Sequence, residues 1–329
     1  MRISPDDPRI RPVGRFVRDG QRLVLGWPGT GLDLRFRGRA LEIDLAGSRA
    51  WIDASLDGGE PFPIALERGV SKAVIPAGGS GDHVVRIRKR TEAMVGDLVL
   101  RGIEVVEGDL LEPPDAPVGR LEFYGDSITC GYGCLDPVPE HGFAAGTESF
   151  PLSWAGRTAA LLGAEVHAMA ISGIGAVRNW PGVAGAPLSA RWNLAHPSRP
   201  TVWDVSRWIP HAVVVNLGTN DFGVLPFPDL SEFVKTFGAW MGRLRAARPG
   251  VPVVVVDGPM LAPDHPAPGT RALVRELLDR IASGVGAIRF SLSPCDPSDG
   301  LAADFHPSVA QHARNAAEFA PFLRELWEL

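Results

Sequence analysis

The segment FYGDSITCGYGC places one serine, Ser127, directly after an acidic residue and before a glycine-rich turn. A serine hydroxyl becomes a useful nucleophile only when a base takes its proton, so Ser127 requires a histidine within hydrogen-bond distance. Of the 8 histidines, His306 is the best candidate, because it lies beside Asp304 in the segment DFHPS just before a predicted helix. His265, in PDHP, is a rival base. Ser127 could instead cap the helix that follows it, since serine is favoured at that position.

Acyl transfer from a serine also needs hydrogen-bond donors aimed at the oxyanion that develops on the substrate. We predict three donors: the backbone N–H groups of Ser127 and Gly173, and the side-chain amide of Asn220. A glycine at position 173 leaves room for an acyl group to approach. Taken alone, the segments SGIG and GTND could equally be turns, because glycine and asparagine tolerate left-handed backbone. We interpret the segment GYG, 131–133, as a turn as well.

The region after residue 120 predicts the elements that must position these side chains. Near-continuous apolar strands alternate there with helical patterns, which indicates a parallel sheet covered on both faces. The predicted strands are 121–124, 166–172, 212–218, 251–258 and 287–292, and the predicted helices are 151–162, 230–248, 271–283 and 307–327. Ligands bind such sheets outside the carboxyl ends of the strands. We therefore expect GDSIT, SGIG, GTND and DFHPS to meet at one edge of the sheet.

The first part of the chain has a different pattern. Residues 1–111 contain short runs of period two, such as LEIDL and WIDASLDGG, separated by frequent turn signals. This pattern predicts an all-β antiparallel sandwich of the jelly-roll kind. Residues 112–120 are rich in proline and predict a stiff linker, which leaves 121–329 as the catalytic domain.

Composition excludes several classes of function. With 33 basic and 38 acidic residues the net charge is −5, and we expect neither nucleic acid nor an anionic membrane as a partner. The 3 cysteines form no CxxC pair and no two histidines have HxH or HxxxH spacing, so we expect no metal and no cofactor. No segment is long and apolar enough for a membrane span, and MRISPDDPRIRP lacks the core of an export signal. We therefore expect a cytoplasmic protein without an obligate protein partner.

The four polar segments together resemble the four blocks of the SGNH hydrolases. Ser127, Gly173, Asn220 and His306 match the residues that give this superfamily its name. RNW at 178–180, WDVSRWIPHAVVVNLGTNDF at 203–222 and GWPGTGLDLRFRG at 26–38 are similar to carbohydrate esterase family 2. The resemblance implies a three-layer, flavodoxin-like catalytic domain. It also implies a metal-independent serine esterase that removes O-acetyl groups from sugars, on polysaccharides such as xylan and glucomannan, through an acyl-enzyme.

The acidic residue departs from the usual SGNH pattern. Such enzymes usually place the acid three residues before the histidine, where this chain has Ala303, whereas Asp304 lies two residues before His306. Family members that the chain resembles orient the histidine either with an aspartate at this spacing or with a backbone carbonyl. We expect the carboxylate of Asp304 to do so.

The segment between the second and third blocks predicts the substrate-binding residues. Positions 178–208 contain four of the 9 tryptophans, and aromatic faces stack on sugar rings. We predict that Arg178, Trp180 and Trp192 bind the acetylated carbohydrate, and that Trp203 and Trp208 pack under the loop.

Two other functions stay open on the sequence. The same blocks could serve a thioesterase or lysophospholipase that acts on longer acyl groups, which would need an apolar acyl channel. The chain could also be a carbohydrate-binding protein with an inactive site, although Ser127 and His306 are both present.

Overall fold

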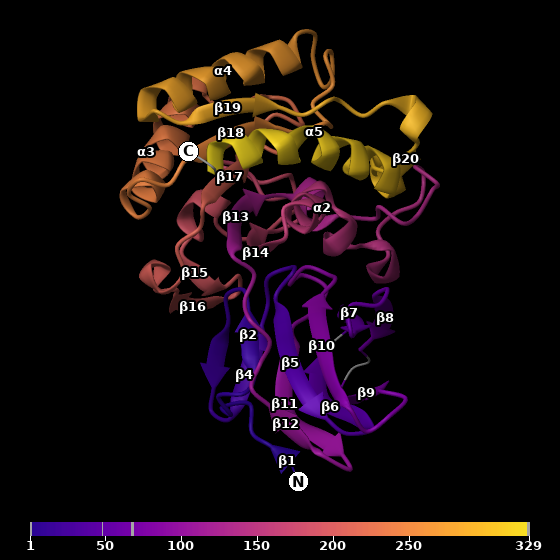
Figure 1. Ribbon diagram of the computed structural model, residues 1–329. Coiled ribbons are helices and arrows are strands. Elements are labelled where there is room, and N and C mark those ends of the chain that lie inside the picture. Colours follow the sequence, from indigo (N-terminus) through magenta and orange to yellow (C-terminus); the bar gives the residue numbers. More distant parts are fainter. Residues whose placement is uncertain (1, 48, 67–68, 328–329) are drawn as a thin grey trace. The chain divides into compact units, whose positions relative to one another are not determined.

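The computed structural model describes residues 2–47, 49–66 and 69–327 (Figure 1). The chain divides into two compact units. The first consists of Met1–Pro117 together with Leu194–Val202, and the second of Val118–Asn193 together with Trp203–Leu329. The first unit therefore includes a short piece of chain that lies, in sequence, within the predicted catalytic domain.

The first unit is built from two antiparallel sheets. One sheet has the order β3-β4-β11-β6-β9 with β1 beside β11, and the other has the order β12-β5-β10-β7-β8 with β2 beside β5. The first sheet contains β1 Arg2–Ile3, β3 Val17–Asp19, β4 Arg22–Leu25, β6 Ala40–Gly47, β9 Gly69–Pro76 and β11 Leu98–Val106. The second contains β2 Arg11–Val13, β5 Gly31–Arg37, β7 Trp51–Leu56, β8 Phe62–Ala65, β10 Asp82–Lys89 and β12 Asp109–Leu111. The prediction of an antiparallel β-domain is confirmed.

The period-two pattern explains the core of this unit. Along β6, Leu41, Ile43 and Leu45 are fully buried, while the acidic residues between them are partly exposed. Successive side chains of a strand point to opposite faces, so one face of the sheet is apolar and packs inward. The Asp-Gly pair at the end of WIDASLDGG forms a turn after β7, with Asp57 at φ 52° and Gly58 at φ 75°.

The piece Leu194–Val202 is a hairpin attached to the sandwich, formed by β15 Leu194–His196 and β16 Arg199–Val202. Trp27 Nε1 donates to the Leu194 carbonyl, at the start of this hairpin, at 3.3 Å. His196 Nε2 lies 2.9 Å from the Asp97 carboxylate. Trp27 and His196 are both buried. These contacts give the tryptophan of the GWPG segment a structural role in holding the hairpin.

The second unit contains the predicted parallel sheet, with the order β14-β13-β17-β18-β19 and parallel pairing throughout. Its strands are β13 Gly119–Gly125, β14 Ala164–Ala170, β17 Ala212–Asn216, β18 Val253–Asp257 and β19 Ile288–Ser291. Counted along the chain, this order is 2-1-3-4-5, the flavodoxin-like arrangement. The predicted α/β fold is therefore confirmed.

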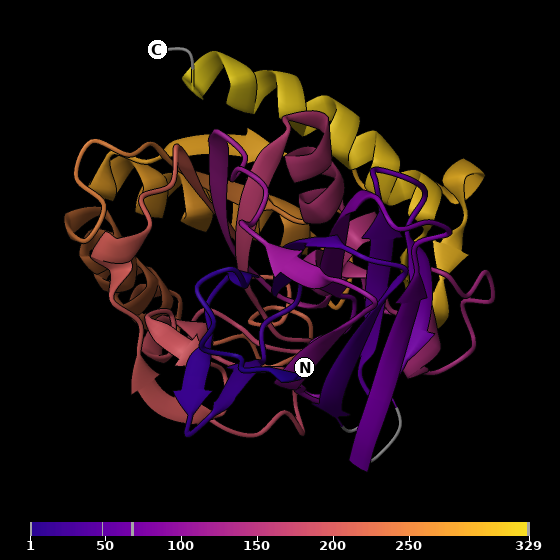
Figure 2. The same cartoon turned by 60° about the horizontal axis from the view of Figure 1, so that its bottom comes forward.

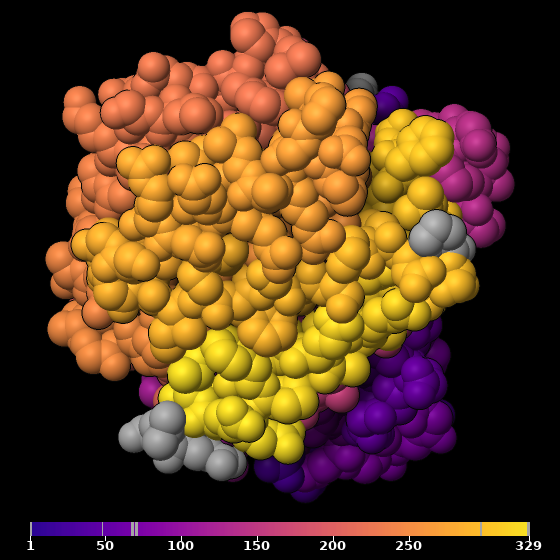
Figure 3. All heavy atoms as spheres, turned by 90° about the horizontal axis from the view of Figure 1, so that it is seen from above, coloured from indigo at the N-terminus to yellow at the C-terminus, as the bar shows by residue number. Residues whose placement is uncertain are grey.

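Helices cover both faces of this sheet. They are α1 Ser127–Cys130, α2 Trp154–Leu161, α3 Leu230–Ala246, α4 Thr270–Val285 and α5 Val309–Trp327. On one face Trp154 of α2 packs against Phe123 and Phe319, and on the other Trp240 of α3 packs against Tyr124. In Figure 2 the yellow α5 and the orange helices lie on different sides of the sheet, and in Figure 3 the C-terminal segments cover the face seen from above. Among the described residues, no helix is both long and apolar enough to cross a membrane.

Two helix boundaries differ from the prediction for local reasons. The helix expected at 151 begins at Trp154, because the Ser153 hydroxyl accepts a hydrogen bond from the Gly156 N–H and so caps it. The helix expected at 307 begins at Val309, because β21 His306–Pro307 pairs with β20 Leu301–Ala302. The second difference matters for function, since it fixes the backbone of His306 before the helix starts.

Candidate active site

The site lies where the strand order of the parallel sheet reverses. β13 has β14 on one side and β17 on the other, and Gly125 at the end of β13 pairs with Asn216 at the end of β17. The segments that follow β13 and β17 leave the sheet at this point, which is where sheets of this kind bind their ligands. GDSIT follows β13 and GTND follows β17. Two of the four predicted segments therefore meet at the expected place.

Ser127 is the first residue of α1 and lies at the end of β13. Asp126, and not Ser127, caps the helix: its side chain accepts from the Ile128 N–H at 3.0 Å. The helix ends after one turn at Gly131, which has φ 75°. The Ser127 hydroxyl is thus not used as a cap, and its N–H is one of the first-turn donors that have no partner inside a helix.

His306 lies 179 positions after Ser127 in the sequence, yet its Nε2 is 2.9 Å from Ser127 Oγ. The imidazole is half-buried. Burial lowers the pKa of His306 to about 4, although backbone carbonyls and the charge of Asp304 act in the opposite direction. A histidine with this pKa is neutral at pH 7 and able to accept a proton from the serine.

The other imidazole nitrogen faces backbone carbonyls. His306 Nδ1 lies 3.2 Å from the Ala303 carbonyl oxygen and 3.1 Å from that of Asp304. An Nδ1–H that donates to a carbonyl leaves Nε2 as the basic atom, which is the tautomer that general-base catalysis by Nε2 requires.

The Asp304 carboxylate has a different partner from the one expected. It accepts a hydrogen bond from the Tyr132 hydroxyl at 2.5 Å. The reason is the left-handed backbone of Asp304, with φ 51° and ψ 35°, in which the carbonyl faces His306 and the carboxylate faces Tyr132. The structure thus favours a backbone carbonyl over the carboxylate that we expected to orient His306.

Tyr132 is a residue that the sequence analysis missed, since GYG was interpreted only as a turn. Its ring stacks on the His306 imidazole with centroids 4.2 Å apart and an interplanar angle of 28°. Phe143 packs against the same tyrosine at 4.8 Å. The only signal in the sequence was an aromatic residue five positions after the serine.

Asn220 lies beside the nucleophile segment and is buried. Its Nδ2 donates to the Ile174 carbonyl at 2.9 Å and to the Asp126 carboxylate at 3.3 Å. Both amide hydrogens have an acceptor, so the role of Asn220 as an oxyanion donor stays a prediction. Burial, with a smaller contribution from the charge of Asp221, raises the pKa of Asp126 to about 7.

Asp221 holds the loop that carries Gly173. Its carboxylate accepts three backbone N–H groups at 2.8 Å, those of Ala176, Val177 and Arg178. Burial raises the pKa of Asp221, and these three hydrogen bonds oppose the increase. The second and third segments are therefore joined by one buried carboxylate.

Arg178 contacts the loop that follows β17. Its guanidinium donates to backbone carbonyls of the loop after β17: to Asp221 at 2.5 Å, Pro226 at 2.7 Å and Val224 at 3.2 Å. These contacts show that Arg178 holds the loop, and its predicted contact with substrate stays a prediction.

The tryptophans divide into two groups. Trp180 is 42% exposed, and its backbone N–H donates to the Gly173 carbonyl at 2.8 Å. Trp203 is buried, and Trp208 stacks on buried His167 with centroids 3.6 Å apart, as the expected packing under the loop requires. Trp192 is half-buried, and its predicted contact with substrate stays a prediction.

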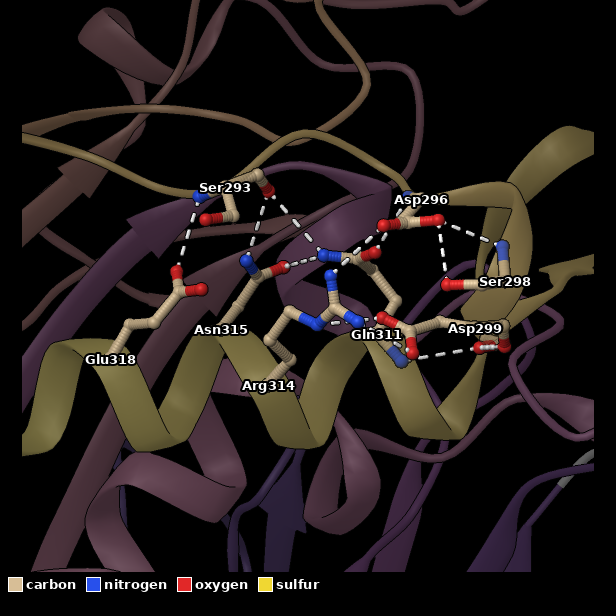
Figure 4. A network of polar contacts seen from close by, with 9 residues as sticks. Ser293, Asp296, Ser298, Asp299, Gln311, Arg314, Asn315 and Glu318 are labelled. Carbon is tan, nitrogen blue, oxygen red and sulfur yellow. Dashed lines mark hydrogen bonds and ion pairs between the residues drawn. The ribbon is translucent and has the colours of Figure 1, made fainter.

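A polar network stabilises the segment that carries His306 by joining the elements that precede and follow it (Figure 4). Arg314 of α5 contacts the carboxylates of Asp296 and Asp299 at 3.3 and 2.8 Å. Gln311 accepts from the Asp296 N–H, and Ser308 donates to the Asp299 carbonyl at 2.6 Å. The loop before β20 is thereby tied to the first turns of α5.

A Ser-His pair at the strand ends of a flavodoxin-like sheet defines an SGNH-type hydrolase. In agreement, residues 123–314 match the GDSL-like Lipase/Acylhydrolase family, and residues 12–114 match the family described as Carbohydrate esterase 2 N-terminal. The chain therefore belongs to the GDSL-like lipase/acylhydrolase family, within carbohydrate esterase family 2.

Individual relatives agree with this assignment. The chain is 33% identical to the cellulase/esterase CelE of Acetivibrio thermocellus, over 93% of this chain but only 38% of the length of that protein. It is 28% identical to an acetylxylan esterase / glucomannan deacetylase of Cellvibrio japonicus, over 99% of this chain and 91% of the relative. A family two carbohydrate esterase from Clostridium thermocellum, solved in complex with cellohexaose, superimposes with a TM-score of 0.89 at 30% identity, over 96% of this chain and 98% of that one.

Proposed function

We propose that this protein is a serine esterase that removes O-acetyl groups from carbohydrates. The observation that carries the proposal is the contact of 2.9 Å between His306 Nε2 and Ser127 Oγ, with Nδ1 held by backbone carbonyls. The activity for which the Cellvibrio relative is named supports an acetylated sugar as the substrate, because this chain matches that relative over almost its full length.

The geometry supports a two-step reaction. His306 Nε2 takes the proton of Ser127 as Oγ attacks the acetyl carbonyl carbon, and the tetrahedral intermediate collapses when His306 protonates the departing sugar oxygen. Water then attacks the acetyl-enzyme with His306 again as the base, and acetate leaves. The N–H groups of Ser127 and Gly173 and the amide of Asn220 would hold the oxyanion in both steps.

Trp180 would form one side of the sugar-binding site. The position that a Cβ would take on Gly173 lies 3.5 Å from Trp180 Cβ, so the side chain of exposed Trp180 begins beside the proposed oxyanion glycine. Exposed aromatic rings stack on the apolar faces of sugars. The proposed partner is therefore an acetylated carbohydrate, held on Trp180 while its ester reaches Ser127.

The choice between an acetyl ester and a longer acyl group can be tested with nitrophenyl esters. We expect kcat/KM to fall by at least about tenfold from the acetate to the octanoate, and acetate to be released from acetylated xylan or glucomannan. The matched control is Ser127→Ala, which removes only the nucleophile. A preference for octanoate would instead support a thioesterase or lysophospholipase.

A further inference from the structure

We propose that Tyr132 positions the His306 imidazole for proton transfer with Ser127, and that the Asp304 carboxylate acts by holding Tyr132 rather than by contacting His306. The inference rests on the proposed function, because it concerns the same Ser127-His306 pair. It adds a residue that acts through His306, and it gives Asp304 an indirect role.

The first argument is that the ring of Tyr132 lies over one face of the imidazole. The two hydrogen-bonded directions of His306, toward Ser127 and toward the carbonyls, fix the ring within its own plane. They do not stop the plane from tilting. The stacked phenol, at 4.2 Å and 28°, supplies that restraint, and Phe143 supports the phenol in turn at 4.8 Å.

The second argument is that Tyr132 is attached to the backbone of the nucleophile. The N–H groups of Gly131 and Tyr132 donate to the Ser127 carbonyl at 3.0 and 3.1 Å. A side chain whose own backbone is fixed to Ser127 places the imidazole relative to the attacking oxygen, and a displacement of about 1 Å in such a geometry can cost about 10²-fold in rate.

The third argument is that Asp304 is held in a conformation that non-glycine residues seldom adopt. Its φ of 51° lies in the left-handed region, and the next residue, Phe305, has φ 59°. Such backbone persists only where the surroundings hold it. Two contacts hold Asp304: its N–H donates to the His141 carbonyl at 2.9 Å, and its carboxylate accepts from Tyr132. The Tyr132 hydroxyl thereby fixes the residue whose carbonyl faces His306.

Four groups contact His306 or interact with it electrostatically. They are Ser127 from α1, Tyr132 after α1, Asp304 from the turn before β21, and His312 from α5. Of these, the Asp304 charge raises the pKa of His306. Removal of that charge should move the acid limb of kcat/KM to lower pH, whereas loss of the Tyr132 hydroxyl should lower kcat with little movement of the limb. A purely structural role of Tyr132 and Asp304 would change neither the acid limb nor kcat.

The test uses four single variants and one double variant of the full chain. Tyr132→Phe keeps the ring and loses the hydroxyl, while Tyr132→Leu loses both. Asp304→Asn keeps an acceptor for the hydroxyl and tolerates left-handed backbone, while Asp304→Ala loses both properties. We expect kcat to fall about tenfold in Tyr132→Phe and Asp304→Ala, about 10²-fold in Tyr132→Leu and less than about fivefold in Asp304→Asn, with KM within about twofold of wild type.

The double variant Tyr132→Phe with Asp304→Ala separates this proposal from a direct role of the carboxylate. If both residues act through one hydrogen bond, the double variant should be no slower than either single variant by more than about twofold. Multiplied effects would contradict the proposal. So would an Asp304→Asn variant that loses about 10³-fold while Tyr132→Phe stays normal, because that pattern belongs to a carboxylate acting on His306 itself.

A second readout keeps this test independent of the substrate. A fluorophosphonate probe reports the activation of Ser127 directly, because Oγ displaces fluoride at phosphorus while His306 takes the proton. We expect labelling rates to follow the same order as kcat. Labelling of the wild type without acetate release would contradict the proposed function but leave the positioning test intact, and an unlabelled wild type would contradict both. Thermal midpoints within about 3 °C of wild type show that each variant is folded.

Discussion

His306 carries the proton in the proposed reaction, and its surroundings decide the pH range in which it can do so. Burial lowers the pKa of His306 to about 4, so the neutral base persists well below pH 6.5. We expect kcat/KM for acetate release to stay flat from pH 7 to about 5 and to halve near pH 4. A midpoint at pH 6.5 or above would show that the imidazole is not desolvated as the structure has it.

The same shift affects stability, and the measurement must allow for it. Because the pKa of His306 is lower in the folded state than its ordinary value of 6.5, the unfolded chain binds the proton more readily. This group therefore makes the folded state less stable as pH falls from 6.5 toward 4. Buried His312, whose pKa burial lowers to about 3, acts in the same direction. Rates should be compared only where circular dichroism shows the native fold.

At the level of single residues, the sequence predicted that Ser127 and His306 lie together, but it did not predict that Tyr132 stacks on His306. The pairing of Ser127 and His306 could be predicted because a hydroxyl and an imidazole at strand ends can act together as a nucleophile and its base. The role of Tyr132 depends on the left-handed backbone of Asp304, which turns the carboxylate away from His306. A non-glycine residue in that conformation is set by tertiary contacts and has no sequence pattern.

At the level of the elements, Arg178 holds the loop after β17 through its guanidinium. Since its guanidinium is bound to three carbonyls of that loop, we expect Arg178→Ala to lower the thermal midpoint by roughly 3 to 8 °C, with KM within about twofold of wild type. Trp180→Ala is the contrasting variant, because an exposed indole should contribute to KM and not to stability. An unchanged midpoint with KM raised tenfold in Arg178→Ala would instead support the prediction that Arg178 binds substrate.

The elements themselves could be predicted where the apolar pattern was continuous. Fully buried strands such as β17 and β18 and the long helices α3, α4 and α5 lie within a few residues of their predicted bounds. The two-residue strands β20 and β21 could not be found, because two residues carry no period. Nor could the attachment of the hairpin β15-β16 to the sandwich be found, since it depends on the distant partners Trp27 and Asp97.

Across the whole molecule, the sequence predicted that the four segments share one sheet edge but not where along it they lie. That position follows from the strand order 2-1-3-4-5, which places the reversal between β13 and β17. The order depends on which strands pair, and apolar patterns do not encode pairing. The cytoplasmic location stays a prediction, which fractionation of native cells would test.

The central claim is that Ser127 becomes acetylated by a carbohydrate ester and that His306 makes this possible. The most direct measurement is rapid quenching of the enzyme with acetylated xylo-oligosaccharide, followed by peptide mass spectrometry. The account predicts an acetyl group on Ser127 in the wild type, its loss as free acetate appears, and no acetylation in Ser127→Ala or His306→Ala. Acetate release at an undiminished rate by Ser127→Ala, or an acetyl group on another residue that turns over, would contradict the account.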